Sequence, residues 1–246
     1  MIKKNIKFLI FLAVFGLIGG YFTALYSVDI LDQATLEQTL AQVGSIEVLI
    51  LITTLQSLLY AVVLGLIGKI IAEKVGLWRE ISFEAGPLIL TAVASLIGGA
   101  IFILADTFVF GRLIPVVLDS YASKPTVDYI IASITYGGVV EEVMLRLFLM
   151  SLIAWLLSRL SADRTASERH FIIANLISAA LFAAGHLPAT VISIGTGTII
   201  ILRCFVMNGA FGLLFGRMYR KYGIQYAMLT HAGLHIVSKL IWILFI

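Results

Sequence analysis

Three long apolar segments of the chain contain titratable side chains of the kinds that carry out acid–base chemistry. Ionisable groups are expensive inside a bilayer and are kept there mostly for function. Of the 14 acidic residues and four histidines, two glutamates and three histidines fall deep in apolar segments. Together with one arginine, they form the set of candidate site residues. The set is Glu141, Glu142, Arg146, His186, His231 and His235.

The spacing of the first group predicts different roles for its two glutamates. Glu142 and Arg146 lie four residues apart, so on an α-helix they share a face with the acid before the base. An ion pair there lowers the cost of burying both charges. Glu141 is rotated by about 100° and cannot easily share Arg146. We therefore expect Glu141 to be a free carboxylate, suited to accept a proton from water. In the alternative interpretation, both glutamates are structural partners of Arg146 and Arg203.

The histidines lie on two other apolar segments. Phe182 and His186 share a helix face, and Pro188 is expected to end that helix just beyond them. His231 and His235 are four residues apart, which places both imidazoles on one face, as in metal-binding helices. No glutamate follows His231, so the segment does not contain the H-E-x-x-H motif of zinc proteases.

Helix geometry gives a rough depth for each group. At about 1.5 Å per residue, Glu141 and His186 both lie about 25 Å from the cytoplasmic ends of their helices, so they can meet. The same count places His231 and His235 only about 10–17 Å along theirs. We expect helix tilt or a longer loop to close this gap. A purely structural alternative is that the buried groups satisfy one another as a polar clamp between helices.

These residues require a membrane-embedded scaffold. The 246 residues are 61% hydrophobic and 13% charged, whereas soluble domains contain about 25% charged residues. We predict one domain over 1–246, an all-α polytopic transmembrane bundle of about seven spans. A possible amphipathic helix at Asp32–Gly44, or a re-entrant helix, would raise the number to eight. The apolar segments are 7–27, 47–71, 86–109, 128–158, 171–187, 190–219 and 224–245.

The basic residues predict the orientation of this bundle. Four clusters of three fall on one side, whereas the opposite loops hold only Arg112 and Lys124. The rule that positive loops stay inside predicts a multi-pass cell-membrane protein with a cytoplasmic N-terminus and an external C-terminus. This bias also explains the net charge of +3, and no motif favours nucleic-acid binding. The clusters are Lys3, Lys4, Lys7; Lys69, Lys74, Arg79; Arg159, Arg164, Arg169; and Arg217, Arg220, Lys221.

Two further cations lie inside apolar segments. Arg203 is expected to pair with Glu142, to contact a substrate or to reach outward to the membrane surface. Lys239 lies near a helix end, where its long side chain is expected to extend towards the surface. The small residues spaced by four over 208–216 predict a face for close helix packing.

Three motifs, each on its own apolar segment, resemble those of the CPBP family. That family comprises the type II CAAX prenyl proteases and related bacterial Abi proteins, which are intramembrane endopeptidases. The resemblance covers about 128–240, which we expect to be the catalytic core. The motifs are Glu141-Glu142-x-x-x-Arg146, Phe182-x-x-x-His186 and His231-x-x-x-His235.

The resemblance implies a role for each motif residue. Glu141 would be the general base that activates water, and Glu142 and Arg146 would support it. His186 would help to hold the water. His231 and the residue four positions later would stabilise the oxyanion, a role that suits a preorganised donor in a water-poor cavity.

Two positions depart from the family pattern. The family often has Asn or Asp where this chain has His235, and it commonly has Phe where Leu145 stands. A neutral imidazole still donates one hydrogen bond, so the role of His235 survives. The family has been described both as metallopeptidases and as metal-free glutamate peptidases. Zinc could be held by His235 with Glu141, His186 and His231, but we expect no cofactor.

The expected function is hydrolysis of a peptide bond in a membrane-associated peptide or protein. A prenylated CAAX-type substrate and a leader or pheromone precursor both agree with the resemblance. One alternative is a transporter or a proton or metal relay that uses the same residues, which inverted repeats would favour, and none is apparent. Another is a non-catalytic membrane scaffold. The sequence leaves the substrate and the oligomeric state open.

Overall fold

The computed structural model describes residues 2–246, with side chains from residue 5 onward, and the described chain contains helices and no strand. The first three apolar segments become α1 (Ile2–Ile30), α3 (Ile46–Leu59), η1 (Tyr60–Leu64), α4 (Gly65–Lys74), α5 (Ala85–Ala105), η2 (Asp106–Phe110) and α6 (Gly111–Leu113). The later ones become α8 (Val127–Ala132), η3 (Ser133–Glu141), η4 (Val143–Met150), α9 (Ser151–Leu160), α10 (Glu168–Gly185), α11 (Leu187–Ile194), α12 (Thr198–Tyr222) and α13 (Ile224–Phe245). The connections contain α2 (Gln33–Val43) and α7 (Pro115–Ser120).

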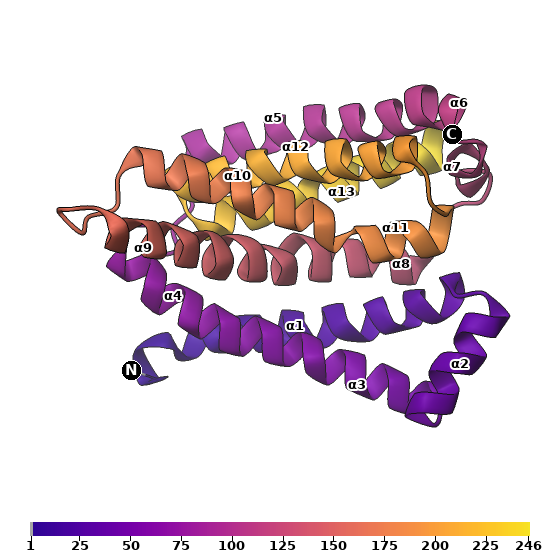
Figure 1. Ribbon diagram of the computed structural model, residues 1–246, viewed down its shortest axis with the longest axis horizontal. Helices are drawn as coiled ribbons and strands as arrows, with labels where there is room; N and C mark the ends of the chain where they lie inside the picture. The colour runs from indigo at the N-terminus through magenta and orange to yellow at the C-terminus, as the bar shows by residue number, and fades with distance from the viewer. Residues whose placement is uncertain (1) are drawn as a thin grey trace.

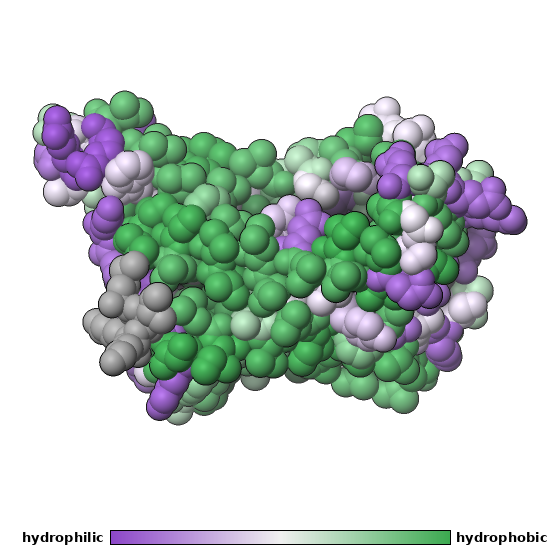
Figure 2. All heavy atoms as spheres, turned by 90° about the horizontal axis from the view of Figure 1, so that it is seen from below, coloured by the Kyte–Doolittle hydropathy of each residue, from purple (hydrophilic) through white to green (hydrophobic). Residues whose placement is uncertain are grey.

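Within the described chain, seven helical stretches are long and apolar enough to cross a membrane, which confirms the predicted all-α polytopic bundle. Hydrophobic side chains form a broad band between hydrophilic ends on the face seen in Figure 2. The spans are Asn5–Ile30, Ile46–Lys74, Ala85–Leu113, Val127–Leu160, Glu168–Ile194, Thr198–Tyr222 and Ile224–Phe245.

The predicted boundary between the fifth and sixth spans was wrong. Pro188 does not end the fifth span, because it lies in the first turn of α11, where a missing backbone N–H costs no hydrogen bond. The helix breaks at His186 and then continues to Ile194. The sixth span therefore begins at Thr198 and not at residue 190.

The fourth span lies at the centre of the molecule. In Figure 1, α1, α3 and α4 lie on one side of the α8–α9 span, and α5, α12 and α13 lie on the other. The segment η3 contacts both α1 and α13. The long connection between α1 and α3 carries α2, which has no buried residue and is capped by Asp32.

Glycines allow the close approach of η3 to its neighbours. A Cβ added at Gly138 would lie 2.7 Å from the Cβ of Ala232 on α13. One added at Gly19 on α1 would lie 2.9 Å from the backbone nitrogen of Tyr136. Small residues let helix backbones pack closely in a membrane, and here they bring three spans together around Glu141.

Candidate active site

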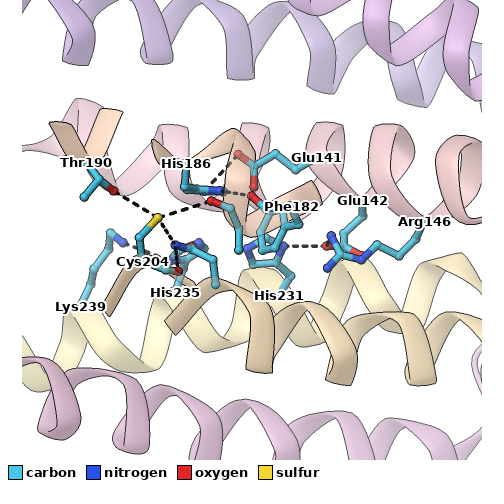
Figure 3. Close-up of polar contacts among 12 residues, drawn as sticks. Glu141, Glu142, Arg146, Phe182, His186, Thr190, Cys204, His231, His235 and Lys239 are labelled. Atoms are coloured by element: carbon cyan, nitrogen blue, oxygen red, sulfur yellow. Dashed lines mark hydrogen bonds and ion pairs between the residues drawn. The ribbon is translucent and has the colours of Figure 1, made fainter. Parts of the chain in front are cut away.

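A cavity of about 380 Å³ opens beside η3 and brings together the three predicted motifs. Glu141, His186, His231 and His235 all line it. Its other walls come from α1, α5, α11 and α12, and they are mainly apolar. Figure 3 shows how the imidazoles and carboxylates converge from different helices.

Glu142 lies behind the cavity wall and anchors two other site residues. Its Oε1 atom is 3.0 Å from Nη1 of Arg146 and 2.8 Å from Nδ1 of His231. The side chains of Glu142 and Arg146 are both completely buried. Arg146 also donates to the carbonyl oxygen of Gly212 and stacks over the ring of Phe182. The predicted ion pair between Glu142 and Arg146 is confirmed.

Glu141 is separate from this cluster, as the spacing predicted. Its side chain is 19% exposed, whereas that of Glu142 is 0% exposed. Its Oε1 atom lies 3.9 Å from Nε2 of His186, which is too long for a direct hydrogen bond. Both residues line the cavity side by side. Of the two glutamates, Glu141 is the one that water can reach.

The orientation of His186 depends on the helix break at this residue. Its Nδ1 atom is 2.9 Å from the carbonyl oxygen of Phe182, in the last full turn of α10. A carbonyl oxygen only accepts, so Nδ1 carries a proton, and in the neutral imidazole Nε2 therefore has a free lone pair. The ring of Phe182 packs edge-on against the imidazole with a centroid distance of 4.7 Å. The lone pair of His186 is therefore held towards Glu141.

His235 occupies the position at which the chain departs from the family pattern. Its ring stacks on that of His231, with centroids 4.9 Å apart. Its Nδ1 atom is 3.4 Å from Nζ of Lys239. An added Cβ at Gly137 would lie 3.3 Å from Nε2 of His235 and 3.8 Å from Oε2 of Glu141. The imidazole edge and the carboxylate thus flank the same glycine.

Lys239 does not reach the membrane surface, contrary to the sequence-based expectation. The residue is only 4% exposed, and its ammonium lies 4.3 Å from the centroid of the Tyr129 ring. Cation–π contact partly compensates a buried ammonium. Because an ammonium has no lone pair, Nδ1 of His235 accepts and the ring proton of His235 is on Nε2.

The predicted depth gap between Glu141 and the last histidines does not exist. The helix ends are not level: Tyr219, near the end of α12, hydrogen-bonds to Ser151, and α9 continues beyond Ser151 to Leu160. The short turn at Gly223 therefore starts α13 well inside the bundle. Counting residues from helix ends failed because it assumed that all turns lie in one plane.

Arg203 does not pair with Glu142. It forms two contacts of 2.6 Å with Asp106, a residue that is 1% exposed. Tyr121 donates a hydrogen bond to the same carboxylate, and burial together with Asp106 raises the pKa of Tyr121. Asp106 carried no clear signal in the sequence, because it lies near the end of the apolar segment 86–109.

Several cavity-lining residues carried no recognisable signal in the sequence. Tyr26 of α1 stacks on Tyr129 with centroids 4.5 Å apart, and both line the cavity. Asn208 also lines it, although its spacing predicted only helix packing. The contribution of α1 was not predictable, since α1 precedes the motif region by about 100 residues.

The four residues that could hold zinc do not form a recognisable metal-binding group in the described chain. No group of three or more His, Cys, Asp or Glu residues within the described part of the chain is close enough to hold a metal ion. The Nδ1 atom of His231 contacts Glu142, and that of His186 contacts a backbone carbonyl. This leaves their Nε2 atoms free, as in most metal-binding histidines, so the absence of a metal cofactor stays a prediction.

Residues 123–237 match the family model described as Type II CAAX prenyl endopeptidase Rce1-like. The matched region contains every predicted site residue from Glu141 to His235. No curated protein and no solved structure matches the chain.

Proposed function

We propose that the chain, whose residues 123–237 match the Rce1-like model of type II CAAX prenyl endopeptidases, is a member of this family and hydrolyses peptide bonds within the membrane by means of a water molecule activated by Glu141. This match supports the coarse activity, that of a membrane-embedded peptidase. We take 128–240 as the catalytic core of a single domain.

One observation carries this proposal: two hydrogen-bond acceptors face each other across 3.9 Å at the cavity wall. They are Oε1 of Glu141 and the unprotonated Nε2 of His186. A water molecule has two O–H donors, and hydrogen bonds of about 2.8 Å to both acceptors suit a separation of this size. Such a water has its lone pairs turned away from both acceptors and into the cavity, ready for attack.

The proton transfer follows from this arrangement. As the water oxygen bonds to the substrate carbonyl carbon, Glu141 accepts a proton from it. When the C–N bond breaks, the same carboxyl group returns a proton to the leaving amine. Glu141 ends the cycle as a carboxylate, and the products are a new carboxyl terminus and a free amine.

His235 is the better placed of the two candidate oxyanion donors. Lys239 holds its ring proton on Nε2, the edge that flanks Gly137 beside Glu141. The Nδ1 proton of His231 already goes to Glu142, so His231 donates to an oxyanion only as an imidazolium. A donor fixed before the reaction costs no reorganisation when negative charge develops. We therefore assign the main oxyanion contact to His235.

The apolar cavity supports a substrate that enters with lipid-soluble groups attached. Its walls include aromatic side chains from several helices, among them Phe102, Phe182 and Phe211. Apolar pockets with few convergent polar groups are typical of sites that bind apolar ligands. We favour a prenylated, CAAX-type peptide over a leader or pheromone precursor, because the apolar walls suit a prenyl chain.

The proposal is tested by comparing membrane peptides from cells that produce the intact protein or the Glu141→Gln variant. We expect peptides cleaved near a lipid-modified carboxyl terminus to accumulate only with the intact protein. Identical peptide sets at equal protein levels would contradict the peptidase assignment and favour a relay or a scaffold.

A further inference from the structure

A second cavity, of about 550 Å³, lies at the end of the bundle where α4 and α9 pack together and the loop 161–167 covers them. Trp155 and Arg159 line it from α9, Lys74 from the last turn of α4, and Arg164 and Thr165 from the loop. Trp155 follows Glu141 by 14 residues, or roughly 20 Å along the span. This cavity is therefore distinct from the candidate active site.

The charge around this cavity is positive. Three of its lining residues are cations and none is a carboxylate. In the part of the chain that the structure describes, neither Lys74, Arg159 nor Arg164 has a carboxylate oxygen within 4 Å. The nearby Asp163 accepts hydrogen bonds from Thr165, which lower the pKa of Asp163, and it does not line the cavity.

One residue that lines this cavity carries an unpaired donor. The indole Nε1 of Trp155 is buried and has no hydrogen-bond partner among the described residues. Most buried polar groups in proteins are hydrogen-bonded, so an orphaned donor requires an explanation. The guanidinium of Arg159 lies 5.2 Å from the centre of this indole ring, which places a cation over the ring that carries the donor.

The loop geometry brings the third cation to the cavity at a backbone cost. Arg164 has a φ of 52°, the only positive value at a non-glycine residue in the described chain. A residue with this conformation is uncommon unless it is glycine, asparagine or aspartate, and strained residues tend to cluster at functional sites. Its amide donates to the carbonyl oxygen of Ser161, which closes a tight turn.

We propose that this cavity binds the phosphate group of an anionic ligand. Guanidinium and ammonium groups form strong charge-assisted hydrogen bonds with phosphate oxygens, and the indole N–H supplies a further donor. Trp155 and Arg159 lie in the last two turns of the span Val127–Leu160, at the depth where lipid phosphates and interfacial tryptophans are found. The phosphate is either the headgroup diester of an anionic phospholipid or free inorganic phosphate.

The test measures one-to-one adducts of the full purified chain by native mass spectrometry. The probes are phosphatidylglycerol, zwitterionic phosphatidylcholine and inorganic phosphate. We expect phosphatidylglycerol to bind and the double variant Arg159→Gln/Arg164→Gln to lose affinity by roughly tenfold or more, since hydrogen bonds to charged groups are strong. If inorganic phosphate shows this dependence and the lipid does not, the ligand is free phosphate.

The matched control is Arg169→Gln/Lys221→Gln, which removes two exposed cations near the same end of the bundle but outside the cavity. Its affinity should stay within about twofold of the intact protein. Equal losses in both double variants would reveal only general attraction to a basic surface and would overturn the proposal. If the first variant fails to fold, Trp155→Phe takes its place: it keeps every charge, so weaker phosphatidylglycerol binding supports the site and unchanged binding overturns it.

Discussion

At the residue scale, the two adjacent glutamates differ in what surrounds them. Glu142 is enclosed by Arg146 and His231, and Glu141 faces the cavity and His186. Helical spacing was enough to predict this difference from the sequence. The partners of isolated cations were not predictable, because the contact of Arg203 with Asp106 joins helices about 100 residues apart.

Removing either partner of the buried pair should lower stability as well as activity. Glu142→Gln or Arg146→Leu strands a charge with no water to solvate it, which costs about 3–5 kcal/mol in a buried ion pair. The amount of folded protein and its melting temperature in detergent measure this effect. Glu141→Gln is the matched control: it removes a neighbouring carboxylate that is outside the ion pair, so its melting temperature should stay unchanged. Equal melting temperatures for all three variants would show that the pair contributes nothing to folding.

Lys239→Met should lower activity without lowering stability. The ammonium is buried without a carboxylate partner among the described residues, so its removal should leave the melting temperature unchanged or raise it. His235 then loses the contact that keeps its proton on Nε2. We expect kcat to fall roughly tenfold, part of the 10²–10³ lost with an oxyanion donor, while KM stays the same. Lys239→Arg keeps the cation and should retain more of the kcat than Lys239→Leu. Full kcat in Lys239→Met, or equal kcat in Lys239→Arg and Lys239→Leu, would remove Lys239 from the positioning role.

At the element scale, the hydrogen bonding of the fourth span is the main feature absent from the sequence-based prediction. Segments η3 and η4 are π-helical and meet at Glu142. Turns of this kind are rare and occur often at functional sites. The pattern of apolar residues gives the length of a helix, but it does not distinguish i→i+4 from i→i+5 bonding. The relative height of α13 was missed for a similar reason, since it depends on packing and not on local sequence.

The close contact between η3 and α13 makes a specific prediction. Gly138→Ala places a Cβ 2.7 Å from that of Ala232 and must push α13 away. We expect a loss of stability of about 1–3 kcal/mol from overpacking, together with lower turnover because His231 and His235 move with α13. Gly86→Ala is the control, because nothing lies within 4 Å of its added Cβ. Thermal unfolding of both variants measures this effect. Equal melting temperatures would contradict the predicted overpacking at Gly138.

At the scale of the whole molecule, the number and length of the apolar segments were sufficient to predict a seven-span bundle. Apolar segments of about 20 residues have few alternatives to a membrane helix, and each was found within 2–4 residues at most ends. The placement of α1 against the fourth span was not predictable, since no motif in α1 marks the contact. Residues of α1 supply one wall of the cavity that the motif region alone cannot form.

The charge bias predicts the topology of this bundle. With clusters of basic residues confined to one side, the loop near Arg164 should be cytoplasmic and Ile246 external. Reporter fusions at these two positions should therefore give opposite signals. A reporter within the loop 31–45, next to α2, serves as a control and should agree with the C-terminal fusion. Matching signals at Arg164 and Ile246 would rule out the three spans placed between these positions and, with them, the seven-span model.

The most direct test of the account is the turnover of purified Glu141→Gln protein on a verified membrane peptide. The substitution keeps the volume of the side chain and removes the proton acceptor, and Glu141 has no buried ion-pair partner to lose. We predict an unchanged melting temperature and a fall in kcat of about 10²–10⁴, the usual scale for general-base loss. A folded Glu141→Gln protein that cleaves the peptide at the full rate would contradict the central claim.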